Sequence, residues 1–523
     1  MSAVSPAVGS SYDAVPYESL PFAQTHPDRL ATLAHLFGLT PPPLAHCRVL
    51  ELGCAGGGNL IPMALAMPGA QFVGVDLSSV QVAQGQALID ALGLRNIRLL
   101  ACSITDIDAT LGRFDYIVTH GVYSWVPEPV QEKILAICAE QLSDHGVAYV
   151  SYNTLPGWHM RGMVRDLMRY HAMPFADPGQ RVAQARGIVD FLAQWVPAQD
   201  NAYGLLLQRE LQTLRSAPDY YVLHEHLEDI NEPLYFHQFA QRAAQHGLQY
   251  LAEADVSSML ASNLPPEVST TLAKISNDVI RQEQFMDFLR NRSFRQTLLV
   301  RQGQPVNRTL TPGRVQALWI GASLQADSPA PDLADLSTRR EEVFRGAHGG
   351  LLKTPNPVTK AAMRVLAQHG PGTLAFDDLL AQALRLLHAA PPAAAATTIT
   401  APALDAQAVL ASDLLQCHLA GLVELHAAPA PYASPTDLRP HFLPCASPLV
   451  RWQAARGLSH VTTLRHEPLQ IDAGMARMLV LLDGSRNADA IGSALEGTEL
   501  ARLPVPALLD QVARAAVLMA VRE

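Results

Sequence analysis

The stretch VLELGCAGGGNLIPMALAMPGAQFVGVDLS, residues 49–78, constrains the fold of this chain most strongly. A short apolar run ends in a loop with four glycines within six positions, and a second apolar run ends at Asp76. A loop this rich in glycine allows a ligand to lie against its backbone. The stretch therefore predicts a strand, a ligand-binding turn, a helix and a second strand, as in Rossmann-like α/β domains.

Strand and helix signals continue to alternate as far as Asn153. Strands are expected over 48–52, 71–77, 96–101, 114–121 and 146–153, and helices over 78–94 and 128–142. Ser78 suits a helix N-cap, and Gly93 suits the stop of the same helix. Strands that alternate with helices predict a parallel sheet with right-handed crossovers.

The length of 523 residues exceeds what one hydrophobic core supports, so several domains are expected. After Asn153 the pattern becomes mostly helical as far as residue 310, and the segment 283–301 is included in this helical prediction. Two helices with a short turn over 356–387 resemble a winged helix or a small bundle. We expect four domains: a ligand-binding domain over 1–175, a helical domain over 176–310, a winged-helix-like region with a linker over 311–435, and a C-terminal domain over 436–523.

Composition excludes some classes of protein. The net charge of −10 and the pI near 6.0 disfavour a protein that coats nucleic acid. The six cysteines show no CxxC spacing and are expected to be reduced thiols in the cytoplasm. The N-terminus lacks the pattern of a signal peptide. The uncharged run 52–75 contains Asn59, two prolines and several glycines, so we expect no membrane span.

The glycines alone leave the ligand open. Gly53, Ala55 and Gly58 form a degraded dinucleotide-binding pattern, whereas Gly53, Ala55 and Gly57 form the pattern of S-adenosylmethionine (SAM) methyltransferases with one alanine in place of glycine. Glu51 favours SAM, because a carboxylate beside the loop repels a pyrophosphate but suits an ammonium and a sulfonium. Asp76 suits ribose hydroxyls in either case. An ordinary strand–turn–helix, with glycines for packing, is the third interpretation.

Several segments carry a family resemblance. They resemble class I SAM-dependent methyltransferases with a methyltransferase regulatory domain, a group that includes bacterial protein-lysine methyltransferases acting on outer-membrane proteins. The resemblance implies a Rossmann-like seven-stranded methyltransferase domain, then α-rich regulatory and winged-helix-like C-terminal domains. The segments are YDAVPYESLPFAQTHPDRLATLAHLFGL, VLELGCAGGGNLIPMA, THGVYSWVPE, SYNTLPGWHMRGMVRDLMRYH and LYFHQFAQRAAQHGLQYLAEAD, with a looser likeness in the tail.

The same resemblance places residues around SAM. Those expected at the cofactor are Glu51, Gly53, Cys54, Ala55, Gly57, Asp76, Leu77, Ser103, Ile104 and His120, and a lid before the first strand would add Tyr12, Tyr17 and His26. Ser103 and Ile104 would lie near the adenine, where many members have an aspartate in place of Ser103. Asp106 suits a helix N-cap equally well.

The methyl acceptor is expected after the fourth and fifth strands, because open α/β sheets bind ligands at the carboxyl ends of their strands. The candidates there are His120, Tyr123, Trp125, Tyr152, Asn153, Trp158 and His159. Tyr152 and Asn153 are the preferred pair: they offer an aromatic face, a hydroxyl and a carbonyl to an amine. Packing is the alternative role for Trp125 and Trp158, and a hydrogen-bonded loop histidine is the alternative for His120.

The leading hypothesis is a SAM-dependent methyltransferase that acts on protein lysine, because more than 300 residues follow the catalytic part. A small-molecule methyltransferase and a non-catalytic SAM-binding regulatory protein stay open. The partners expected are a protein substrate, with an outer-membrane protein as one candidate, and a second copy of this chain. No metal site is expected; His224 and His226 are the nearest signal. Five arginines suit either a solvated helix face or a docking surface for an acidic partner: Arg281, Arg290, Arg292, Arg295 and Arg301.

Overall fold

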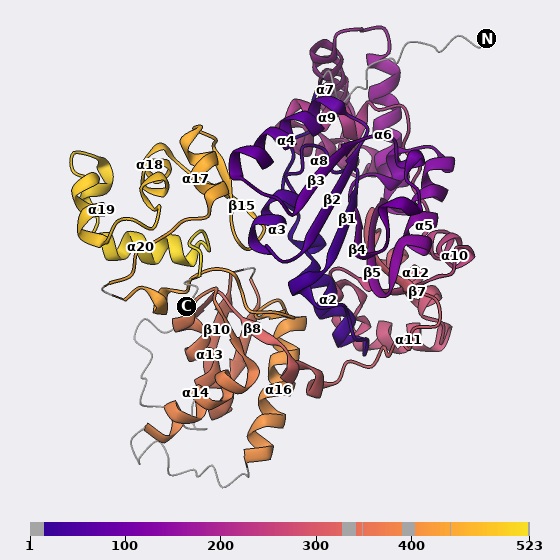
Figure 1. Ribbon diagram of the computed structural model, residues 1–523. Helices are drawn as coiled ribbons and strands as arrows, with labels where there is room; N and C mark the ends of the chain where they lie inside the picture. The colour runs from indigo at the N-terminus through magenta and orange to yellow at the C-terminus, as the bar shows by residue number, and fades with distance from the viewer. Residues whose placement is uncertain (1–14, 327–340, 348, 390–402, 440, 521–523) are drawn as a thin grey trace. The chain divides into compact units, whose positions relative to one another are not determined.

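The computed structural model describes residues 15–326, 341–347, 349–389, 403–439 and 441–520 (Figure 1). The chain forms two compact units. The first consists of Met1–Ser19, Arg48–Leu60 and Gln71–Gly303, and the second consists of Leu20–Cys47, Ile61–Ala70 and Gln304–Glu523. The domain boundaries predicted near residues 175, 310 and 435 stay predictions.

The first unit is built on a seven-stranded sheet with the order β3-β2-β1-β4-β5-β7-β6. All neighbours from β3 to β5 pair in parallel, and β7 runs antiparallel to both β5 and β6. The five strands predicted before Asn153 are confirmed. The strands are β1 (Arg48–Leu52), β2 (Gln71–Asp76), β3 (Ile97–Ala101), β4 (Phe114–Thr119), β5 (Leu142–Asn153), β6 (Leu248–Glu253) and β7 (Phe294–Arg301).

Two helices flank the parallel part of the sheet on opposite sides (Figure 1). In α4 (Ser79–Leu92) the Ser78 hydroxyl accepts from Gln81 N, and Gly93 ends the helix with a φ of 67°. The predicted cap and stop are therefore confirmed. In α5 (Glu128–Gln141) the side chains of Ile134, Ile137 and Cys138 are buried in the core of the unit.

Helices fill most of the chain between β5 and β7. Four of them, α6 to α9, share one apolar core that includes Val164, Val189, Leu207 and Val222. Their bounds are α6 (Gly157–Ala172), α7 (Pro178–Trp195), α8 (Ala202–Ser216) and α9 (Asp219–His226); α10 (Phe236–Gln245), α11 (Pro266–Ile275) and α12 (Val279–Arg290) follow.

The helix predicted over 283–301 is wrong where β7 lies, and β6 is a strand within the region 158–310 that was expected to be mostly helical. The helix expected over 283–301 ends at Arg290, because Asn291 adopts a left-handed φ of 48° and terminates α12. The chain then enters β7, which pairs with β5 on one side and β6 on the other. These two strands complete the sheet of the first unit, although β6 begins 95 residues and β7 begins 141 residues after the end of β5.

Arg295 also differs from the prediction. It lies on β7 and is fully buried, with ion pairs to Glu253, Glu283 and Asp287 at 2.7 to 3.0 Å. Its guanidinium stacks on the ring of Phe236 at 3.8 Å. Neither a solvated helix face nor a docking surface describes this arginine, because a buried charge requires partners of opposite sign within the fold.

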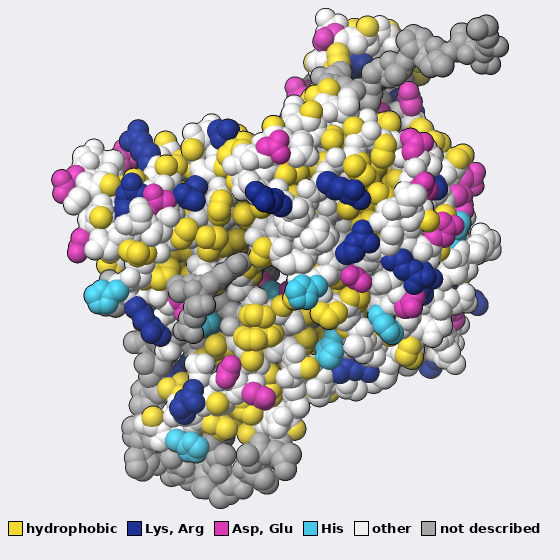
Figure 2. Space-filling model, viewed as in Figure 1, with side chains coloured by type: hydrophobic (Ala, Val, Ile, Leu, Met, Phe, Trp, Pro, Cys, Tyr) yellow, Lys and Arg dark blue, Asp and Glu magenta, His cyan; other side chains and the backbone are white. Residues whose placement is uncertain are grey.

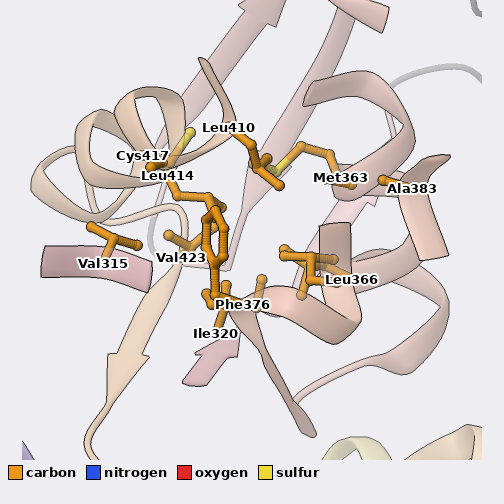
Figure 3. Packing of buried hydrophobic residues seen from close by; sticks show 14 of the residues in the cluster. Val315, Ile320, Met363, Leu366, Phe376, Ala383, Leu410, Leu414, Cys417 and Val423 are labelled. Atoms are coloured by element: carbon orange, nitrogen blue, oxygen red, sulfur yellow. The ribbon is translucent and has the colours of Figure 1, made fainter. Parts of the chain in front are cut away.

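The second unit holds two separate cores. One joins α13, α14 and α16, whose side chains pack around the ring of Phe376 (Figure 3). The other joins helices α17 to α20 through residues such as Val450, Met478 and Leu508. Two helices over the predicted pair 356–387 are confirmed as α13 and α14, and the turn between them contains the short strand β12.

The remaining helices and strands belong mainly to the second unit. The helices are α2 (Pro27–Leu36), α13 (Pro357–His369), α14 (Phe376–Ala389), α16 (Ala403–Leu419), α17 (Pro448–Ala455), α18 (Ala473–Leu481), α19 (Ala488–Ala494) and α20 (Val505–Arg514), and α3 (Leu60–Ala66) begins in the first unit. The strands are β8 (Trp319–Gly321), β9 (Leu324–Ala326), β10 (Glu342–Gly346), β11 (Leu351–Thr354), β12 (Thr373–Ala375), β13 (Glu424–His426), β14 (His460–Thr462) and β15 (Pro468–Gln470).

Acidic and basic side chains are interspersed with apolar ones over the face shown in Figure 2. Among the described helices, none has both the length and the apolar character required to cross a lipid bilayer.

Candidate active site

The glycine loop after β1 depends on backbone conformations that favour glycine. Gly53 and Gly57 have φ values of 80° and 75°. A Cβ atom on Gly53 would lie 2.3 Å from Val122 Cγ2, so the loop after β4 lies directly against the loop after β1. Ala55, which stands where the methyltransferase pattern has glycine, takes a left-handed φ of 48°. The alanine therefore keeps the backbone shape of the motif at a strain of about 1–2 kcal/mol.

Asp76, at the end of β2, holds this loop in place. Its Oδ2 accepts from Ala55 N at 2.8 Å, and its Oδ1 accepts from Ser78 N at 2.9 Å. A carboxylate has about four acceptor positions, which suits a group that can bind backbone N–H groups and ribose hydroxyls. Leu77 follows and is 69% exposed, which suits a residue that covers a planar ligand.

We expect Asp76→Ala to weaken SAM binding by about 1.5–3 kcal/mol, because charge-assisted hydrogen bonds to the ribose would be lost. Calorimetric titration with SAM measures this change. Asp106→Ala serves as the control, since Asp106 is an exposed carboxylate after the neighbouring strand β3. Equal affinities of the Asp76 variant and the unmodified protein would show that Asp76 does not face the ribose.

Glu51 carries a buried oxygen without a protein partner. Its Oε1 accepts from Asn59 Nδ2 at 2.7 Å, whereas Oε2 has no hydrogen-bond partner among the described residues. Burial raises the pKa of this carboxyl to about 8. An ammonium group bound here would satisfy Oε2 and favour the carboxylate form. The orphaned oxygen therefore fits the amino group of SAM.

This raised pKa predicts a pH dependence of SAM binding. The Glu51 carboxyl of the free protein is protonated below its pKa of about 8. Binding of an ammonium lowers that pKa and releases a proton, so affinity should rise with pH toward about 8. Because the amino group of SAM itself titrates near pH 8, the experiment compares the unmodified protein with Glu51→Gln. The same pH dependence in both proteins would contradict the assignment.

Cys54 and the residues after β3 have mainly structural partners. Cys54 N donates to Val75 O at 3.1 Å, and burial raises the pKa of the Cys54 thiol well above its usual value. Ser103 caps a short 3-10 helix by accepting from Thr105 N, so Ser103 and not Asp106 provides this cap. Ile104 packs against the core of the unit. The backbone of Ser103 and Ile104 stays the predicted contact for adenine.

His120 follows β4 and is a neutral group at physiological pH. Its Nδ1 lies 2.9 Å from the Tyr149 hydroxyl, and burial lowers the pKa of the imidazole to about 4. The next residue, Gly121, donates its N–H to Ser151 Oγ at 2.8 Å. These bonds hold the chain after β4 beside β5. The glycine loop follows β1, which is the neighbour of β4 on its other side.

The predicted pairing of Tyr152 with Asn153 is wrong in its geometry. Successive residues of a strand point to opposite faces of the sheet. Tyr152 is buried in the core, stacked on Phe239 at 4.1 Å, with its hydroxyl 3.1 Å from Thr297 Oγ1. Asn153 points to the other face, which it shares with Tyr149 and Ser151.

The remaining aromatic candidates also differ in how deeply they are buried. Tyr123 is fully buried beside Phe239. Trp125, by contrast, is half-buried and meets Trp158 edge to face at 6.2 Å. His159 lies on the surface with its Nε2 3.2 Å from the Tyr235 hydroxyl.

One residue at the glycine loop, Ser19, was not predicted from the sequence, whereas Tyr17 was a predicted lid residue. Ser19 Oγ accepts from Gly58 N at 2.8 Å, and a Cβ on Gly58 would lie 2.0 Å from the Ser19 backbone oxygen. Tyr17 makes an edge contact with Tyr220 of α9 at 5.2 Å. The segment 15–19 thus spans from α9 to the glycine loop. The absence of a side chain at Gly58 is the signal that a second chain segment approaches there.

The other two lid candidates are Tyr12 and His26. Tyr12 falls outside the described residues. His26 belongs to the second unit, where it caps α2 by accepting from Asp28 N and makes an edge contact with His466 at 5.4 Å.

The described residues contain no group of three or more His, Cys, Asp or Glu side chains arranged for a metal ion. His224 contacts Val15 O and Glu228, whereas His226 lies near Tyr221, so the two histidines have different surroundings. All six cysteines are free thiols.

Family models match along the chain. A methyltransferase domain model matches residues 49–146, a predicted methyltransferase regulatory domain matches 218–301, and a PKMT C-terminal winged helix domain matches 443–501. The winged helix model therefore lies in the part for which the sequence predicted a C-terminal domain.

Similar proteins cover most of the chain. The uncharacterized protein RP789 of Rickettsia prowazekii is 42% identical over 375 residues, which is 71% of this chain and 68% of that protein. RP028 of the same organism is 41% identical over 46% of this chain and 96% of its own length. The solved structure of PKMT2 from Rickettsia typhi in complex with AdoHcy has a TM-score of 0.84 and 29% identity, and the match covers 97% of this chain and 100% of that one.

The fold, the geometry of the site and the similar proteins all indicate the same family. The strand order places Glu51, the glycine loop and Asp76 at the carboxyl ends of neighbouring strands, and the buried oxygen of Glu51 fits the amino group of SAM. The chain belongs to the class I SAM-dependent methyltransferases that carry a methyltransferase regulatory domain and a PKMT winged helix domain.

Proposed function

We propose that this SAM-dependent methyltransferase transfers methyl groups to lysine side chains of a protein. The observation that carries the proposal is the extent of the likeness to PKMT2, which covers 97% of this chain and therefore includes the parts beyond the SAM domain. The PKMT winged helix model at 443–501 supports the same substrate class. A small-molecule enzyme would not require so much additional chain.

The residues around the cofactor have distinct tasks in this proposal. Glu51 binds the amino group, Asp76 binds the ribose, and the glycine loop lies against the cofactor through its backbone. SAM supplies the methyl group on a sulfonium that is already a leaving group, so the protein mainly aligns the acceptor and excludes water.

The acceptor lysine must lose a proton before it can attack. Burial in a site of low polarity disfavours the ammonium form and lowers its pKa. His120, with a pKa near 4, stays neutral and adds no positive charge beside two cationic reactants. Asn153 is the proposed hydrogen-bond acceptor for the amine, and Trp125 and Trp158 are the proposed aromatic walls. Tyr123 and Tyr152 would act from the core by positioning the loop and strand.

The test combines purified protein, SAM labelled in the methyl group and candidate protein acceptors, followed by hydrolysis and identification of the labelled amino acid. Labelled methyllysine is the expected product. Label that remains in small molecules would support a small-molecule acceptor, and label on another amino acid would contradict the lysine proposal.

Three finer proposals concern partners and location. Outer-membrane proteins are the first acceptors to try, because the resembling enzymes act on them. The free cysteines and the dependence on SAM favour the cytoplasm. Association of two copies is proposed as well, and light scattering of the purified protein tests it.

A further inference from the structure

Phe294, the first residue of β7, exposes an aromatic ring beside the proposed acceptor site. It is 39% exposed, although most of the strand that it begins is buried. The centroid of its ring lies 6.1 Å from that of His120, and the two rings are nearly perpendicular. In the pairing of β7 with β5, Phe294 lies directly opposite Asn153. Phe294 is therefore next to both the loop after β4 and the end of β5.

The ring lies on the same face of the sheet as the proposed acceptor site. Side chains of residues that are directly opposite in neighbouring strands share a face. Phe294 thus shares the face of Asn153. The contact with His120 agrees, because His120 Nδ1 is 2.9 Å from the hydroxyl of Tyr149, which lies on that face. Phe294 consequently borders the acceptor site and points away from the core that holds Tyr152.

The position of Phe294 is fixed from two sides. The next residue, Arg295, points to the opposite face, where it forms ion pairs with three buried carboxylates at 2.7 to 3.0 Å. The preceding residue is tied to the chain after β5, because Ser293 O accepts from Thr154 N at 2.9 Å. These interactions hold the start of β7 in place, so the ring of Phe294 is presented by a rigid part of the fold.

The chemistry of the ring suits one part of a lysine acceptor. A phenylalanine ring offers apolar surface and has no hydrogen-bonding group. The stem of methylene groups that carries the lysine amine gains stability when an apolar surface covers it. The same surface removes water from around the amine and so favours its neutral form, which is the form that attacks. Of the aromatic walls proposed above, Trp158 is only 2% exposed, so Phe294 is the more accessible ring.

We propose that Phe294 binds the methylene stem of the acceptor lysine and helps to determine which acceptors the site takes. Phe294 belongs to the segment 218–301 that matches the regulatory domain model, and it lies outside the segment 49–146 that matches the methyltransferase domain model. The regulatory segment would then supply part of the acceptor site itself. The assignment to lysine rests on the proposed function, whereas the apolar character of this wall does not.

The test uses two analogues of SAM, so it requires neither turnover nor a known protein acceptor. In both, a tertiary amine replaces the sulfonium; one carries a methyl arm and the other a hexyl arm, whose atoms stand for the methyl group, the lysine nitrogen and the methylene stem. In calorimetric titrations the unmodified protein should bind the hexyl analogue about tenfold more tightly. Phe294→Ala should remove most of this preference and leave the affinity for the methyl analogue unchanged. Phe294→Leu keeps an apolar side chain and should retain most of the preference.

Phe191→Ala is the matched control, because Phe191 is an exposed phenylalanine on α7. The assignment would be overturned by an unmodified protein without the preference, by its retention in Phe294→Ala, or by its equal loss in Phe294→Leu or in the Phe191 variant. The assay for methyllysine separates this proposal from the proposed function. If Phe294→Ala loses the preference but the enzyme forms no methyllysine, the lysine-transfer proposal fails while the apolar wall stands. If methyllysine forms and Phe294→Ala keeps the preference, only the role of Phe294 fails.

Discussion

Gly53→Ala should weaken SAM binding by about 2 kcal/mol or more, which is about 30-fold. The φ of 80° at Gly53 is strained for any residue with a Cβ, and that Cβ would lie 2.3 Å from Val122 Cγ2. Relief of the clash requires movement of Val122, which lies two residues from His120. The substitution should therefore disturb the cofactor loop and the loop after β4 together.

Gly56→Ala is the matched control in the same loop. Its added Cβ would meet Gln81 O at 3.5 Å, an ordinary contact, and its φ lies outside the left-handed region. Titration with SAM and thermal unfolding on both variants distinguish loss of binding from loss of folding. If the two variants bind SAM equally well, the geometry of Gly53 does not determine cofactor affinity.

The glycine loop was predictable because its chemistry is local. Glycines in left-handed conformations, an acidic residue at each strand end and a capped helix appear within about thirty residues of sequence. The pattern identified the ligand class, and the buried oxygen of Glu51 agrees with it.

The face on which Tyr152 lies was also readable from the sequence. Ala148, Val150 and Tyr152 alternate with polar Ser151 and Asn153 along β5. Because side chains alternate between faces, Tyr152 belongs with the apolar residues. The prediction considered which residues follow a strand and did not consider the face to which each one points.

Other features depend on partners distant in sequence. The pairing of β7 with β5 and β6 is formed by strands separated by a large helical insertion, and no local pattern specifies it. The burial of Arg295 likewise depends on Glu253, which lies 42 residues earlier. The contact of Ser19 with Gly58 joins segments on either side of α2. Sequence periodicity describes one helix or strand at a time, so it does not predict contacts between distant segments.

Asn153→Ala should lower the rate of methyl transfer by about 10²-fold, because orientation of reactants contributes several kcal/mol to such reactions. Asn153 lies at the end of β5 with its backbone N–H donated to Ser124 Oγ at 2.9 Å. Its side-chain Nδ2 donates to Asn231 Oδ1, also at 2.9 Å, so the amide has a fixed orientation. The carbonyl oxygen Oδ1 is then the acceptor that the side chain offers to an amine hydrogen. SAM affinity should change far less, because Glu51 and Asp76 lie on other strands.

Two further variants distinguish the role of Asn153 from the role of Tyr152. Asn153→Asp keeps an acceptor but adds a negative charge that stabilises the lysine ammonium, so its rate should be low near neutral pH and recover as the pH rises. Tyr152→Phe removes a hydroxyl that contacts Thr297 inside the core and keeps the stacked ring, so its rate should stay within about threefold of the unmodified enzyme. Methyl-transfer rates and SAM titrations, measured on the same preparations, test these roles. A wild-type rate in Asn153→Ala would move the acceptor site toward His120 and Trp125, whereas a larger loss in Tyr152→Phe than in Asn153→Ala would restore the tyrosine hydroxyl as the group that acts on the amine.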